Sequence, residues 1–163
     1  MSRALFLIAV LDAAHDRSMF DSGTPALDRY LHKQVTQDIR RRVAACFVAL
    51  TDERRIAGYY TLATAGLPLG DLPTDIRRKL PRYPVVPTIR MGRLAVDQAF
   101  KGQGLDSALL VNALRRAALS EIAAFALIVD AKDDEAAAFY RHHGFIALPD
   151  SPLTLFLPLA TVR

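Results

Sequence analysis

One stretch, residues 88–120, constrains the fold of this chain more than any other. It begins with the apolar run Thr88–Val96, passes through the turn Lys101-Gly-Gln-Gly-Leu105 and continues as the amphipathic segment Ser107–Ser120. This pattern predicts a strand that ends in a glycine turn, which opens directly into a helix. Such a turn presents unpaired backbone N–H groups at the positive end of a helix dipole. We therefore expect an anion site here, suited to a pyrophosphate; a tight turn without a ligand is the alternative.

The rest of the chain alternates between strand and helix patterns around a central hairpin. Strands are expected at Ala4–Leu11, Val43–Leu50, Ile56–Ala65, Phe125–Asp130 and Leu153–Leu157, and helices at Pro25–Gln37, Thr74–Leu80 and Glu135–His143. The continuous apolar run at 125–130 is typical of a strand buried on both faces. Together these elements predict a mixed α/β sheet with helices on both faces. No linker-like block divides the 163 residues, so we expect one domain, residues 1–163.

Composition excludes several classes of protein. A hydrophobic content of 52% with 8 Gly and 9 Pro argues against disorder. Cys46 is the one cysteine, which excludes an intramolecular disulfide and a multi-cysteine zinc site, and its apolar surroundings indicate a buried structural thiol. Arg3 followed by eight apolar residues resembles the start of a signal peptide, but the run is too short to span a bilayer and charged residues follow. We expect a first strand there and a cytoplasmic protein.

The formal net charge is +4, contributed mostly by arginine. Arginine suits planar contacts to phosphate, whereas the alternative is a solvated basic surface. The basic candidates are Arg40–Arg42, Arg77–Lys79 with Arg82, Arg90, Arg93 and Arg115–Arg116.

The glycine turn resembles the signature Arg/Gln-x-x-Gly-x-Gly/Ala of the GNAT superfamily of N-acetyltransferases. Further segments are similar to one branch of that family, from about His15 to the C-terminus; they are Phe20–Gly23, Leu27, Tyr30-Leu31, Tyr59–Leu62, Val85–Pro87, Gly92–Asp97 and Ala137–Tyr140. That branch comprises the acetyltransferase toxins of bacterial toxin–antitoxin pairs, which acetylate the amino group of aminoacyl-tRNA. The resemblance implies a GNAT fold with a mixed, mostly antiparallel sheet, acetyl-CoA as co-substrate and no metal.

Acetyl-CoA carries a pyrophosphate and a long pantetheine arm, and each needs its own partners. The edge of the strand at Leu94, Ala95 and Val96 could bind the pantetheine amides, and the resemblance places the carbonyl-binding N–H near Val96. Gly102 and Gly104 suit the pyrophosphate because a Cβ would obstruct the backbone donors. The full set of candidate cofactor-binding residues is Leu94, Ala95, Val96, Lys101, Gly102, Gln103, Gly104, Leu105, Asp106, Ser107 and Asp133.

Three of these residues depart from the family pattern. Lys101 stands where Gln or Arg is usual, and Asp133 stands where many relatives have Asn. Asp106 replaces a Gly or Ala in the first turn of the helix, beside the expected pyrophosphate. Its charge would repel the ligand, so we hypothesise that this copy binds acetyl-CoA weakly. The alternative is that Asp simply favours a helix N-terminus; both can hold.

The resemblance assigns the proton donor to Tyr140. A phenol can give a proton to the departing thiolate, although an aromatic side chain here could equally be core; we expect the adjacent Phe139 to be the better core residue. The resemblance also implies tRNA as acceptor, and the candidate tRNA-binding residues are Arg77, Arg78, Lys79 and Arg93. The implied partners are a ribbon-helix-helix antitoxin, operator DNA through that antitoxin, and a second copy of the chain in a homodimer.

Two other functions stay open at this point. The first is acetylation of a small-molecule amine. The second is a catalytically weak component, retained for antitoxin binding or repression because Asp106 impairs the cofactor site.

Overall fold

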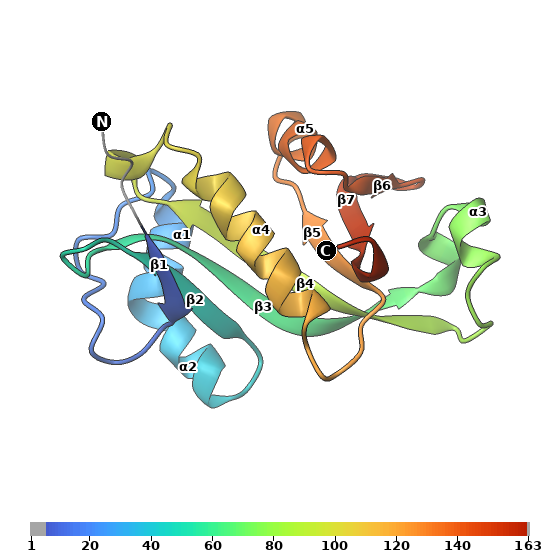
Figure 1. Ribbon diagram of the computed structural model, residues 1–163, viewed down its shortest axis with the longest axis horizontal. Coiled ribbons are helices and arrows are strands. Elements are labelled where there is room, and N and C mark those ends of the chain that lie inside the picture. Colours follow the sequence, from blue (N-terminus) through green and yellow to red (C-terminus); the bar gives the residue numbers. More distant parts are fainter. Residues whose placement is uncertain (1–5, 163) are drawn as a thin grey trace. The chain divides into compact units, whose positions relative to one another are not determined.

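The computed structural model describes residues 6–162, which form two compact units that share two long strands (Figure 1). The first unit consists of the described part of Met1–Ala63 together with Gly92–Ala113. The second consists of Thr64–Met91 and the described part of Leu114–Arg163. Within the described residues, seven strands pair in the order β1-β2-β3-β4-β5-β7-β6. The pair β4–β5 is parallel, while β1–β2, β2–β3, β5–β7 and β6–β7 are antiparallel, which confirms the predicted mixed, mostly antiparallel sheet.

The first unit contains a hairpin, a composite helix and the glycine turn. Its elements are β1 (Leu7–Val10), α1 (Pro25–Arg29), the π-helix η1 (Tyr30–Gln34), α2 (Val35–Arg40), β2 (Ala45–Leu50), most of β3 (Ile56–Pro68), the end of β4 (Val85–Val96), η3 (Gln98–Phe100) and most of α4 (Leu105–Ala118). The segments α1, η1 and α2 follow one another beside β2 (Figure 1). Leu31, Val35, Val48 and Tyr59 are fully buried in the core of this unit.

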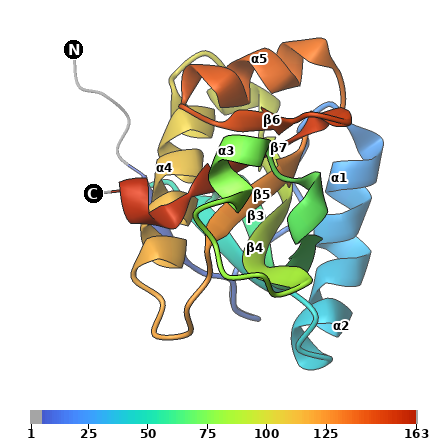
Figure 2. The same cartoon turned by 90° about the vertical axis from the view of Figure 1, so that its right-hand side faces the viewer.

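The second unit is built around β5 and its two neighbours. Its elements are the ends of β3 and α4, η2 (Leu69–Asp71), α3 (Thr74–Arg77), most of β4, β5 (Ala126–Asp130), α5 (Asp134–His142), β6 (Ile146–Leu148), β7 (Ser151–Pro158) and η4 (Leu159–Thr161). Helix α5 lies along β7 (Figure 2). The strand β5 is buried from Ala126 to Val129, as its continuous apolar run predicts.

The sequence predicted the elements better than their ends. The helix expected at Pro25–Gln37 continues to Arg40 and is interrupted by a π-helical turn, whereas the helix expected at Thr74–Leu80 ends at Arg77. Helix α4 starts at Leu105 rather than Ser107, because the Ala108 N–H already bonds the Gly104 carbonyl. The short strand β6 was not predicted. The N-terminal part of the strand expected at Ala4–Leu11 lies outside the described residues, and its remainder forms β1.

Candidate functional site

The glycine turn lies at the end of β4 in the first unit. Gly102 and Gly104 have φ angles of +81° and +76°, in the left-handed region that favours glycine. A Cβ added at either residue would meet no heavy atom within 4 Å. The backbone conformation therefore dictates glycine at both positions, and the space on which their Cα atoms border is open to a ligand. This geometry fits the pyrophosphate predicted there.

Helix α4 adds backbone donors at the same place. The Ala108 N–H bonds the Gly104 carbonyl at 3.1 Å, so the N–H groups of residues 105–107 precede the helical hydrogen-bond ladder. The exposed Asp106 carboxylate accepts from the Ser107 N–H at 2.8 Å. The chain thus supplies its own anion to one of the donors that a pyrophosphate would use.

Asp97 organises the segment between β4 and this turn. Its carboxylate is 2% exposed and accepts from the Asp21 N–H at 3.0 Å, the Ala99 N–H at 2.9 Å and the Arg55 guanidinium at 3.3 Å. The Gln98 N–H bonds back to the Asp21 carbonyl at 2.9 Å. Sequence reasoning gave Asp97 no role. The sequence did offer one clue, because Asp97 directly follows an apolar strand. A carboxylate buried at such a place needs several hydrogen-bond donors.

Lys101 has a partner within the chain that the sequence did not predict. Its ammonium donates to the Ser22 carbonyl at 2.6 Å, so it ties the glycine turn to the segment Phe20–Thr24 of the same unit. A lysine has three N–H donors, which leaves capacity for a phosphate in addition. Gln103, between the two glycines, is exposed.

The end of β4, which is predicted to bind pantetheine, packs closely against β3 and α4. Ala95 is buried, while Leu94 and Val96 are half-buried. A Cβ added at Gly58 on β3 would lie 2.9 Å from the Ala95 carbonyl oxygen and 2.9 Å from Leu109 Cδ1 on α4. Glycine at position 58 therefore permits β3, β4 and α4 to approach closely.

Tyr140 lies on α5 in the second unit. Its side chain is 8% exposed and packs in edge contact with Phe139 at 5.3 Å and beside Phe145 at 5.6 Å between ring centroids. Phe139 is only half-buried, so the expectation that Phe139 is the better core residue was wrong. Burial, followed by the negative charge of Asp130, raises the pKa of Tyr140 to about 12. The phenol therefore keeps its proton at neutral pH.

Asp133 and Asp130 have structural partners in the same unit. Asp133 is the N-cap of α5, and its carboxylate accepts from the Ala136 N–H at 2.8 Å. Asp130 forms an ion pair with Arg90 and accepts from the Thr154 hydroxyl at 2.9 Å. The capping bond explains an Asp at position 133 without any ligand.

The predicted tRNA-binding residues fall in both units. In the second unit Arg78 and Lys79 are exposed, and Arg77 bonds the Gly70 carbonyl and the Thr74 hydroxyl. In the first unit the Arg93 guanidinium lies 3.4 Å from the centroid of the Tyr30 ring, and the Tyr30 hydroxyl donates to Asp38 at 2.7 Å. Arg93 is thus half-buried and stacked rather than freely extended.

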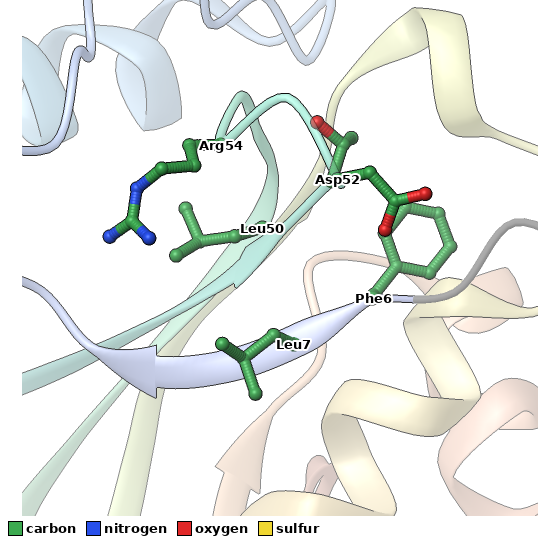
Figure 3. Close-up of a pocket in the computed structure, with 6 residues that line it drawn as sticks. Phe6, Leu7, Leu50, Asp52 and Arg54 are labelled. Carbon is green, nitrogen blue, oxygen red and sulfur yellow. The ribbon is translucent and has the colours of Figure 1, made fainter.

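Two hollows in the first unit contain none of the predicted site residues. One lies between the start of β1 and the β2–β3 turn, and Phe6, Leu7, Leu50 and Arg54 are among its lining residues (Figure 3). The other lies beside η1 and α2.

Over residues 6–162, no group of three or more His, Cys, Asp or Glu side chains is placed to hold a metal ion. Within the same residues no helix has the length and apolar character needed to cross a membrane.

Comparison with known proteins gives consistent matches. The family model described as "Acetyltransferase (GNAT) domain" matches residues 42–147. A tRNA-acetylating toxin of Mycobacterium tuberculosis is 40% identical over 152 residues, which cover 92% of this chain and 90% of that protein.

Two solved structures illustrate the similarity in three dimensions. The toxin AtaT in complex with acetyl-methionyl-tRNAfMet has a TM-score of 0.89 and 31% identity, and the match covers 96% of both chains. A tyrosine-to-phenylalanine mutant of AtaT, bound to the C-terminus of the antitoxin AtaR and to acetyl-CoA, has a TM-score of 0.81 and 26% identity, and the match covers 96% of this chain and 95% of that one.

Proposed function

Since the chain belongs to the GNAT acetyltransferase family, we propose that it transfers the acetyl group of acetyl-CoA to the amino group of aminoacyl-tRNA and so blocks translation. One observation carries the proposal: a tRNA-acetylating toxin matches 92% of the chain at 40% identity. The glycine turn supports the use of acetyl-CoA. It combines open space, positive φ angles and a helix N-terminus of the kind that binds pyrophosphate.

The first unit would hold acetyl-CoA, which supplies the acetyl group as a thioester. Gly102, Gln103 and Gly104 would offer backbone donors to the pyrophosphate, together with the first turn of α4 from Leu105 to Ser107. The strand from Leu94 to Val96 would bind the pantetheine amides, and an N–H near Val96 would bind the thioester carbonyl. Lys101 and Asp97 would fix the turn through Ser22 and Asp21. Asp133 would bind pantetheine while its carboxylate also keeps the capping hydrogen bond from the Ala136 N–H.

Tyr140 would act as the general acid. The acceptor nitrogen attacks the carbonyl carbon, the carbon–sulfur bond breaks, and the Tyr140 hydroxyl gives its proton to the departing sulfur. The phenolate then takes up the proton that the acceptor nitrogen releases as it becomes an amide. The raised pKa of Tyr140 keeps the phenol protonated before the reaction and favours this recovery, while it makes the phenol a weaker proton donor in the first step.

Acceptor recognition and partners complete the proposal. Arg77, Arg78 and Lys79 would contact tRNA phosphates, with Arg93 as a further candidate. A ribbon-helix-helix antitoxin would bind and silence the enzyme, and operator DNA would be reached through that antitoxin. We further propose a homodimer and a single folded domain. AtaT, a structural relative, is seen with its antitoxin AtaR, which supports the antitoxin partner.

An acceptor screen with labelled acetyl-CoA tests the proposal. Aminoacyl-tRNA should take up label, whereas deacylated tRNA, which lacks the amino group, should not. Polyamines and amino sugars are the competing acceptors. Faster transfer to a small amine would favour the small-molecule enzyme. Absence of acetyl-CoA binding by calorimetry would leave only a non-catalytic role.

A further inference from the structure

Helix α2 in the first unit ends in the exposed run Arg40-Arg-Arg42. The helix is closed by two hydrogen bonds of 3.0 Å, from the Arg42 N–H to the Ile39 carbonyl and from the Val43 N–H to the Asp38 carbonyl. These bonds form a Schellman motif, which requires its penultimate residue in the left-handed conformation. That residue is Arg42, with a φ of +60°.

Stability of the fold does not explain arginine at this position. Glycine is the residue usually found there, because a Cβ in the left-handed region costs conformational energy. The helix dipole favours cations in the last turn and so explains Arg40, but Arg42 lies beyond the last turn. A strained position of this kind leads to a hypothesis of function for the side chain, which the surroundings of Arg42 must then support.

The surroundings of Arg40 contain both basic and acidic side chains. Arg40 borders an open cavity of about 550 Å³ between the segment Leu11–Arg17 and the helices η1 and α2, which Arg17, His15 and His32 also line. The carboxylates that line it, Asp12 and Asp16, are hydrogen-bonded within their own loop, to the Ala14 N–H and to Ser18 respectively.

The three arginines keep their donors available. Between residues 6 and 162, no side-chain hydrogen bond or ion pair is seen for any of them, although the positive charge of Arg41 contributes to lowering the pKa of the Asp38 carboxyl. By contrast, the Arg17 guanidinium is engaged with the Thr36 hydroxyl at 2.7 Å, and Arg93 is stacked on Tyr30. Exposed guanidinium groups gathered at a helix end are suited to contacts with the phosphates of a nucleic acid.

We infer that Arg40, Arg41 and Arg42 form a phosphate-binding ridge for the RNA acceptor, in addition to the proposed contacts of Arg77–Lys79. The inference rests on the proposed function for the identity of the RNA. The contact is to the backbone, so it contributes affinity and salt dependence rather than discrimination between sequences.

Arg54 provides a matched control. It lies in the β2–β3 turn of the same unit, also has a left-handed φ, of +64°, and is exposed. It follows Asp52 and Glu53 in sequence, and its side chain extends away from Asp52 beside Leu50 (Figure 3). Replacement by glycine should relieve the same strain at both sites, whereas only position 42 belongs to the ridge.

The experiment compares Arg42→Gly, Arg42→Lys and Arg54→Gly in thermal unfolding and in tRNA binding by fluorescence anisotropy over a series of salt concentrations. Both glycine variants should raise Tm, by about 2 °C. Arg42→Gly should weaken tRNA binding about fivefold and reduce the slope of log K against log salt by close to one, while Arg54→Gly should change neither. Arg42→Lys keeps the charge and should retain most of the affinity.

Equal affinity and salt slope for Arg42→Gly and Arg54→Gly would overturn the inference. So would loss of antitoxin binding by Arg42→Gly with unchanged tRNA binding, because the ridge would then contact a protein. Acetyl transfer by the parent chain is measured in parallel. If the parent binds tRNA through Arg42 but does not acetylate it, the proposed reaction fails and the ridge stands.

Discussion

The Asp106 carboxylate accepts a hydrogen bond from the Ser107 N–H at 2.8 Å in the first turn of α4. This N–H belongs to the set of donors that a pyrophosphate at the glycine turn would need. An anion from the chain and an anion from the ligand therefore compete for the same donor and for the same helix dipole. Exposure of Asp106 to solvent weakens the charge repulsion between its carboxylate and the pyrophosphate. It does not free the Ser107 N–H for the ligand.

Replacing Asp106 with glycine should tighten acetyl-CoA binding about tenfold, as measured by calorimetric titration. The fold should become slightly less stable, because Asp is favourable in a first helical turn and glycine is not. Asp134→Gly is the matched control, since Asp134 is also in the first turn of a helix, α5, and is not part of the predicted cofactor site. Equal acetyl-CoA affinity for parent and Asp106→Gly would show that the carboxylate does not compete.

Gly58→Ala should destabilise the fold by about 2 kcal/mol or more, because the added Cβ would lie 2.9 Å from the Ala95 carbonyl oxygen. Gly70→Ala is the matched control, since a Cβ there meets nothing within 4 Å. Denaturant unfolding of both variants gives the comparison. A loss of stability at position 58 no larger than that at position 70 would mean that β3 and β4 separate at little cost.

The glycine turn and its flanking elements were readable from the sequence because their causes are local. An apolar strand, two glycines and an amphipathic helix follow one another within about thirty residues. The network around Asp97 was not readable, because Asp21 lies 76 positions away. The role of Lys101 was missed for the same reason, since Ser22 is 79 positions away.

Local sequence patterns also did not predict the irregular or very short elements of the backbone. The π-helical turn Tyr30–Gln34 has the same amphipathic composition as the α-helices on either side, so periodicity could not reveal it. Strand β6 has three residues, too few for an alternating pattern. The greater burial of Tyr140 than of Phe139 depends on which face α5 turns toward β7, and tertiary packing decides that.

Tyr140→Phe should lower turnover by about 10²-fold or more while leaving acetyl-CoA affinity unchanged. The ring and its contacts with Phe139 and Phe145 are kept, so the change removes only the hydroxyl. The measurement is best made in an Asp106→Gly background, where cofactor binding is expected to be stronger. Tyr83→Phe, at a side chain that is 69% exposed, is the control. Unchanged turnover would exclude Tyr140 as the proton donor.

Neutral replacements of Arg77, Arg78 and Lys79 should weaken tRNA binding and flatten its salt dependence, by close to one slope unit for each phosphate that the variant no longer neutralises. Arg78 and Lys79 are exposed, so their replacement should leave stability nearly unchanged. Replacing Arg77 also removes its bonds to Gly70 and Thr74, and its effect on stability is measured separately. A salt slope equal to that of the parent would show that this segment does not touch phosphate.

Stability should fall as the pH rises above about 10. Burial raises the pKa of Tyr140 from 10.0 to about 12, so between these values the unfolded chain has released a proton that the folded chain retains. Because the folded state then binds more protons, the free energy of unfolding decreases with pH, by at most about 1.4 kcal/mol per pH unit for this group. Tyr30 and Tyr59 also have raised pKa values caused chiefly by burial and should contribute in the same direction. Denaturant unfolding of Tyr140→Phe between pH 9 and 12 should therefore show a shallower, but not flat, decline than the parent. Identical declines would mean that the Tyr140 phenol ionises as readily in the folded chain as in the unfolded one.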